Sequence, residues 1–125
     1  MTTMRLMSKL WLDYDGRAFG DGPARLLYGV ERSGSLRKAA LELGMSYNKA
    51  WRILHAAEER LGFALLDRSV GGSLGGGSHL TAQARDLVDR YQAVEDEADE
   101  ALTAIFWRHF ADWQSPGSIG PGQRE

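Results

Sequence analysis

The 125-residue chain contains no cysteine and only three prolines, and it has no long apolar run. Without cysteine there is no disulfide framework, no thiolate metal site and no cysteine nucleophile. A membrane-spanning helix needs about 18 consecutive apolar residues, so none is expected here. No apolar stretch follows Arg5 and Lys9 near the N-terminus, so we expect no signal peptide. These absences predict a cytoplasmic protein.

The residues that are present fit one ordinary globular domain, with 43% hydrophobic and 26% charged residues. The formal net charge of −2 hides an asymmetry along the chain. Residues 1–92 carry 13 Lys and Arg against 10 Asp and Glu, whereas residues 93–110 carry one basic residue against five acids. A mildly basic body followed by an acidic segment indicates that the two parts have different roles.

The N-terminal part predicts a β-hairpin followed by a helix. Apolar and polar residues alternate from Ser8 to Tyr14, and Asp15-Gly16 then favours a tight turn. Arg17 to Phe19 would form the short return strand. Pro23 is expected at the first position of a helix that ends at Ser33-Gly34, because the missing N–H costs nothing there.

Two short helices separated by a tight turn come next. Ser35 is a predicted N-cap for a helix over Leu36 to Leu43, and Gly44 is a good residue to end it. Ser46 is the predicted N-cap of a third helix that runs to about Leu61. Two helices joined by so short a turn are typical of the helix-turn-helix unit.

The segment after this unit predicts a wing and a long helix. An apolar run from Phe63 to Leu66 is followed by a glycine-rich loop, Gly71 to Ser78, and by His79-Leu80. Thr81 is the expected cap of a helix that reaches about Phe110. The expected fold is therefore mainly α, a winged helix-turn-helix with an N-terminal β-hairpin and a long C-terminal helix. We expect one domain over residues 1–110 and a disordered tail over 111–125.

The helix after Ser46 presents the side chains that read a DNA duplex. At 100° per residue its apolar residues fall on one stripe and its polar residues on the opposite arc. Asn can pair bidentately with adenine, Arg with guanine, and Lys with guanine or phosphate. An ordinary solvated face is the alternative, but base contacts occur at this end of the second helix of such units. The candidate DNA-binding residues are Ser46, Tyr47, Asn48, Lys49, Trp51, Arg52 and His55, with Arg68 as a phosphate contact in the wing.

The long helix carries apolar residues at alternating spacings of three and four. Thirty helical residues extend about 45 Å, which is more than a body of this size can cover. A homodimer seam is the natural way to bury the remainder, and the acids on the other faces would keep the stem away from phosphates. The predicted dimerisation residues are Leu87, Tyr91, Val94, Ala98, Ala101, Leu102 and Ile105.

The sequence carries no recognisable catalytic or metal-binding motif. The glycine-rich loop has Gly77 where a P-loop needs its lysine. His55, His79 and His109 are far apart and fit no ligand spacing. We therefore expect no enzymatic activity, no cofactor and no metal.

The stretch from Gly34 to Arg52 resembles the DNA-binding domain of LysR-type and ModE-type regulators. Ser46-Tyr47, Ala50-Trp51 and the wing segment Asp67 to Gly72 are more similar to the ModE type, which responds to molybdate. The resemblance covers about residues 10–91. It implies that the third helix reads the major groove and that the long helix dimerises. The chain ends where ModE proteins continue into their molybdate-binding domains, so we expect no molybdate or tungstate binding.

The function predicted from the sequence is sequence-specific binding of double-stranded DNA by a homodimer, and hence transcriptional regulation. The alternative is a winged-helix protein-interaction module that does not bind DNA. A salt-dependent shift of duplex DNA would separate the two hypotheses.

Overall fold

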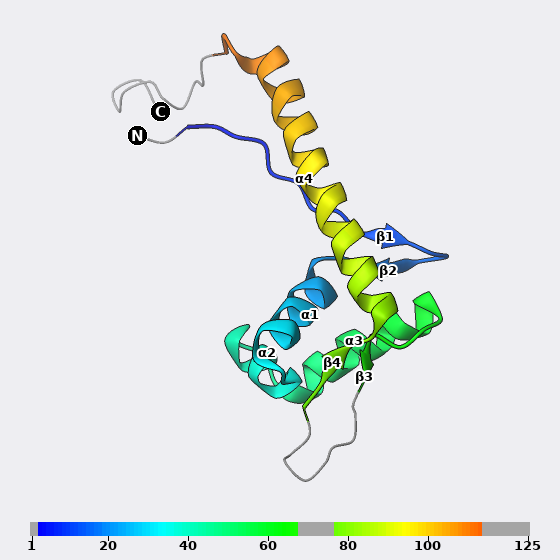
Figure 1. Cartoon of the computed structure of the whole chain (residues 1–125). Coiled ribbons are helices and arrows are strands. Elements are labelled where there is room, and N and C mark those ends of the chain that lie inside the picture. The colour runs from blue at the N-terminus through cyan, green and yellow to red at the C-terminus, as the bar shows by residue number, and fades with distance from the viewer. Residues whose placement is uncertain (1–2, 68–76, 114–125) are drawn as a thin grey trace. The chain divides into compact units, whose positions relative to one another are not determined.

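The computed structural model describes residues 3–67 and 77–113, and the fold within them is mainly helical (Figure 1). By contacts the chain divides into two compact units, one of residues 9–93 and one that combines residues 1–8 with residues 94–125. The elements, in chain order, are β1 (Leu12–Asp13), β2 (Arg17–Phe19), α1 (Asp21–Ser33), α2 (Leu36–Glu42), α3 (Tyr47–Leu61), β3 (Leu66–Asp67), β4 (His79–Leu80) and α4 (Ala82–Phe110). This order confirms the predicted hairpin, helix pair and long C-terminal helix.

The N-terminal hairpin is shorter than predicted. β1 and β2 pair antiparallel around Asp15-Gly16, where Asp15 has a φ of +62° and the Gly16 amide donates to a carboxylate oxygen of Asp13. The strand expected from Ser8 onward is reduced to two residues. The Leu10 carbonyl accepts a hydrogen bond from the Tyr91 hydroxyl at 2.8 Å. This segment therefore bonds to α4 rather than extending the hairpin.

Helix α1 begins two residues before the predicted position. Gly20, in an extended conformation, is its N-cap, so Pro23 occupies the third position rather than the first. Proline is tolerated there because the first-turn amides have no partner within the helix. At the other end Gly34 has a φ of +76°, and its amide donates to the Val30 carbonyl at 2.6 Å. This left-handed residue ends the helix as the sequence predicts.

Serine caps define the starts of α2 and α3, as predicted. The Ser35 hydroxyl accepts from the Lys38 amide at 3.1 Å, and the Ser46 hydroxyl accepts from the Lys49 amide at 3.0 Å. Gly62, with a φ of +86°, closes α3. Each serine cap accepts from an amide that has no partner within the helix, and this stabilises the helix by about 1 kcal/mol.

The two wing strands pair with each other, and a hydrogen bond joins the start of the second strand to the helices. β3 and β4 pair antiparallel, with Leu66 opposite Leu80. The Ser78 amide donates to the Gly34 carbonyl at 3.0 Å, which joins the start of β4 to the turn between α1 and α2. Most of the predicted glycine-rich loop falls in residues 68–76, outside the described residues.

One hydrophobic core holds the unit of residues 9–93 together. Phe19, Leu26, Leu27 and Leu65 are fully buried, and they come from β2, α1 and the approach to β3. Tyr91 of α4 is 2% exposed and meets Phe19 edge to face, with ring centroids 5.2 Å apart. Each large apolar side chain buried in this way contributes about 1.5–3 kcal/mol. The first turns of α4 therefore belong to the same core as the helix-turn-helix.

Helices α1 and α2 approach most closely at Gly29. A Cβ added at Gly29 would lie 2.7 Å from the Cβ of Ala39, which is itself fully buried. Gly29→Ala should gain about 1 kcal/mol in helix propensity but cost about 1–3 kcal/mol in overpacking. We expect a net loss of up to about 2 kcal/mol in the free energy of unfolding, measured by urea denaturation.

The matched control is Gly22→Ala in the same helix. The added Cβ there has only an ordinary contact, 3.9 Å from a methyl carbon of Ile53. Its expected effect is neutral to slightly stabilising. Equal stability of the two variants would show that the α1–α2 contact is not tight.

The unit that contains the second half of α4 has apolar residues on two sides of the helix. Phe106 is mostly buried, and its ring stacks on Phe110 with centroids 4.9 Å apart. Residues of the N-terminal segment, among them Leu6, line a small hollow together with Phe106. Val94 and Ile105 are 51% and 42% exposed. No helix among residues 3–67 and 77–113 is long and apolar enough to cross a membrane.

Candidate nucleic-acid interface

Helix α3 separates its apolar and polar residues as the sequence predicts. Ala50, Leu54 and Ala57 are buried against the core. Asn48 and Arg52 are exposed on the opposite arc. The polar side chains thus point away from the body at the end of α3 that the Ser46 cap holds in place. Of the other predicted contacts, Tyr47 is half-buried against the core, whereas Ser46, Lys49, Trp51 and His55 are exposed.

Trp51 and His55 interact with each other one turn apart on α3. Their rings are stacked with centroids 4.6 Å apart, and Trp51 remains 38% exposed. The Nδ1 atom of His55 lies 3.8 Å from a carboxylate oxygen of Glu58, and its Nε2 atom lies 3.5 Å from a carboxylate oxygen of Glu59. His55 therefore faces its own helix, and it would have to exchange these neighbours to donate to another molecule.

Glu58 also has a structural role. Its other carboxylate oxygen accepts a hydrogen bond from the Leu65 amide at 2.7 Å, and the side chain is half-buried. The connection between α3 and β3 is thereby joined to α3 itself. This contact turns one carboxylate oxygen of Glu58 toward the wing, while the other stays near His55.

Arg37 belongs to the same surface, and sequence analysis did not identify it. Its guanidinium carbon lies 4.5 Å from the centroid of the Tyr47 ring, which brings the first turn of α2 against the first turn of α3. Lys38 follows it on α2 and is also exposed. An Arg-Lys pair in the first turn after the Ser35 cap could have been recognised, because the first helix of such units crosses a DNA backbone.

The cations of this surface form no ion pair among the described residues, whereas four other arginines of the chain do. Arg25, Arg32, Arg85 and Arg90 all form ion pairs with nearby carboxylates. Within the described part of the chain, no ion pair engages the four cations at the starts of α2 and α3, and all four are exposed. These four are Arg37, Lys38, Lys49 and Arg52. Such a group suits a polyanion with regularly spaced charges. Arg68, the predicted contact in the wing, lies outside the described residues.

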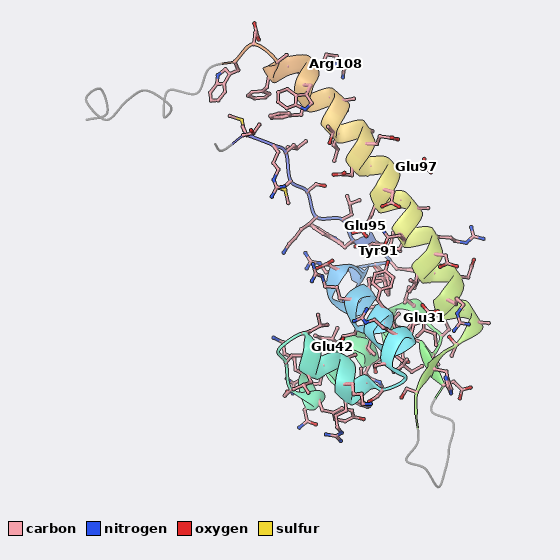
Figure 2. All side chains as sticks on the ribbon, turned by 60° about the vertical axis from the view of Figure 1, so that its left-hand side comes forward. Glu31, Glu42, Tyr91, Glu95, Glu97 and Arg108 are labelled. Carbon is pink, nitrogen blue, oxygen red and sulfur yellow. The ribbon has the colours of Figure 1, made fainter. Side chains whose placement is uncertain are left out.

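The residues predicted to form a dimer seam divide along α4. Tyr91 is buried in the core of its own chain, and Leu87 packs partly against that core. Ala98 and Leu102 are half-buried. The exposed members are Val94, Ala101 and Ile105. Figure 2 shows the acids Glu95 and Glu97 along α4 and Arg108 near the C-terminal end of that helix.

Known proteins are similar to this chain over most of its length. Residues 24–85 match the bacterial regulatory helix-turn-helix protein, lysR family. The molybdenum transport protein ModE of Azotobacter vinelandii is 38% identical over 106 residues, which are 84% of this chain and 39% of that protein. The DNA-binding transcriptional dual regulator ModE of Escherichia coli (strain K12) is 28% identical over 107 residues, or 84% of this chain and 37% of that protein. The chain thus spans less than two fifths of the length of these relatives.

A solved structure also resembles this chain in fold. The crystal structure of the CbnR_DBD-DNA complex matches with a TM-score of 0.52 and 25% sequence identity, covering 63% of this chain and 85% of that one. The fold is therefore a winged helix-turn-helix, as the order of elements predicts. Residues 24–85 form a helix-turn-helix domain of the lysR family, and the chain is a relative of ModE proteins over 84% of its length.

Proposed function

We propose that this chain is a sequence-specific regulator of transcription that binds double-stranded DNA through α3. The observation that carries the proposal is the group of four exposed cations at the starts of α2 and α3, none of which has an ion-pair partner within the described residues. The similarity to lysR-family and ModE proteins supports it. A regulator of this kind would act in the cytoplasm, where the chromosome of a bacterium lies.

The residues of this surface divide into base readers and backbone contacts. Asn48 and Arg52 lie on the arc farthest from the core, and we assign them to adenine and guanine edges in the major groove. Arg37, Lys38 and Lys49 border that arc and are assigned to phosphates. The remaining assigned contacts are Ser46, Tyr47, Trp51 and His55, with Arg68 from the wing.

We further propose that the chain acts as a homodimer through the second half of α4. One apolar side of this half includes Phe106, which shares a hollow with the N-terminal segment. The other side, which includes Val94, Ala98, Ala101 and Ile105, leaves Val94 and Ile105 substantially exposed. A second copy of the same helix is the natural partner for a stripe with this spacing. Molybdate binding is not part of this proposal.

Salt dependence of duplex binding tests the proposal. An operator selected from a random duplex library should bind with an affinity that falls steeply as salt rises. Four phosphate contacts in each of two subunits, the three cations above and Arg68, would give a slope of about −7 in log K against log [salt]. Removal of one contact per subunit by Arg37→Ala should make the slope shallower by about 2.

Arg90→Ala is the matched control for this experiment. Arg90 is equally a surface arginine, but it pairs with Asp86 one turn away on α4. Its removal should leave both affinity and slope unchanged. Absence of any duplex binding at low salt would contradict the proposal and favour a protein-interaction module.

A further inference from the structure

A cavity of about 650 Å³ lies in the unit of residues 9–93, and none of its lining residues is a proposed DNA contact. Its walls come from the N-terminal hairpin, the first turn of α1 and the middle and end of α3. Ile53, Ala56 and Arg60 are its exposed or half-buried α3 residues. At about 100° per residue these lie roughly 40–100° around the helix from Arg52. Cavities of about 300–1,000 Å³ are the usual size for small-molecule sites.

The residues beneath the cavity are apolar. Phe19 is fully buried beneath it, and Ala18 and Ala57 are nearly so. Trp11 forms part of the hairpin wall and is 47% exposed. An indole that is half open to solvent beside an apolar floor offers a flat surface for stacking.

The charged lining is predominantly positive. Lys9, Arg17 and Arg60 line the cavity, and Asp21 is the acid among the lining residues. A carboxylate oxygen of Asp21 lies 3.0 Å from the Arg25 guanidinium, so its charge is already compensated. An anion that entered the cavity would therefore meet three cations and little repulsion.

Two of these cations are held in place before any ligand arrives. The Arg17 guanidinium carbon lies 4.1 Å from the centroid of the Trp11 ring. The Arg60 guanidinium donates a hydrogen bond to the Asp15 carbonyl in the hairpin turn. A guanidinium that is already ordered loses less rotamer entropy when it binds a carboxylate.

We propose that this cavity binds a small organic anion with a flat apolar body, such as an aromatic carboxylate. The apolar body would lie over the floor at Phe19 and against Trp11. The carboxylate would be bound by Arg17 or Arg60, which can form two parallel hydrogen bonds with such a group. Neither the residues nor the ligand belongs to the proposed DNA surface.

The test uses 2-naphthoate as the probe and 2-naphthamide as its uncharged counterpart, with no DNA present. The chain has four tryptophans, so labelling with 5-fluorotryptophan gives one ¹⁹F resonance for each. Trp11→Phe identifies the resonance of Trp11. We expect naphthoate to shift that resonance in a saturable manner and naphthamide to bind at least tenfold more weakly.

Variants of the cations provide the second part of the test. Arg17→Gln and Arg60→Gln should each weaken naphthoate binding at least threefold, whereas Arg90→Gln should not. Unchanged resonances of Trp51, Trp107 and Trp113 would show that each variant is folded. If Arg17→Gln does not fold, Arg17→Lys takes its place in the comparison. No saturable shift at Trp11, or equal affinity for the acid and the amide, would overturn the proposal. Neither outcome bears on DNA binding.

Discussion

Replacing both Ala98 and Ile105 with glutamate is expected to give a monomer whose affinity for its operator is lower by orders of magnitude. The two positions lie on the same side of α4, seven residues apart, and Ile105 is 42% exposed. In a dimer packed along this side, the new carboxylates would face each other, in a segment that already carries five acids. Uncompensated charges buried in an interface cost more than a seam of small apolar residues can offset.

The loss of affinity follows from the geometry of a two-fold operator. Two recognition helices in a dimer would meet successive major grooves ~34 Å apart. A monomer contacts one half-site and neutralises half as many phosphates, which removes much of the salt-dependent binding energy. Analytical ultracentrifugation gives the mass, circular dichroism the helix content, and titration with labelled operator the affinity.

A control with the same added charge lies on another side of the same helix. Ala93 and Ala104 are exposed and share a side of α4 roughly 100° from the proposed seam. Their double replacement by glutamate should leave the protein dimeric. If the seam variant were monomeric but bound its operator as tightly as the unchanged protein, dimeric recognition would be wrong. If it stayed dimeric, the interface would lie elsewhere.

The Arg52→Ala variant should lose discrimination at one base pair of each half-site. A guanidinium that pairs with a guanine edge contributes about 1–3 kcal/mol of discrimination, or roughly 5- to 150-fold at that position. The fold should be unaffected, because the side chain is exposed and forms no ion pair among the described residues. Binding-site selection on the variant measures the change directly.

Arg37→Ala distinguishes a base reader from a backbone contact. Arg37 stacks on Tyr47 at the start of α2, and we assign it to a phosphate. Its removal should weaken binding to all sequences alike and leave the selected site unchanged. If Arg52→Ala behaved in the same way, Arg52 would be a phosphate contact rather than a reader.

Local signals predicted the parts of the fold that depend on local chemistry. Ser35 and Ser46 each cap the helix that the sequence assigned to them, and Gly62 ends α3 with a positive φ. These features need only neighbouring residues to form. The polar arc of α3 was predicted for the same reason, since it depends only on the helical period.

Long-range contacts decided what the sequence could not show. The first strand is shorter than predicted, and the Leu10 carbonyl just before it bonds to the hydroxyl of Tyr91, which is 81 residues away. The apolar spacing of α4 is the same in its buried and exposed halves, so spacing alone could not show that Tyr91 packs against Phe19. Arg37 joins the candidate interface through a contact between two helices.

The acidic second half of α4 gives the proposed dimer an unusual response to ionic strength. Screening by salt weakens repulsion between two stems that each carry five acids and one arginine over residues 93–110. The same salt weakens the attraction between the cations of α2 and α3 and the phosphates. Subunit association and operator binding are linked equilibria, so at low protein concentration the two effects of salt on operator occupancy oppose each other. Occupancy of the operator should then be greatest at an intermediate ionic strength, which would buffer the regulator against changes in the salt content of the cell.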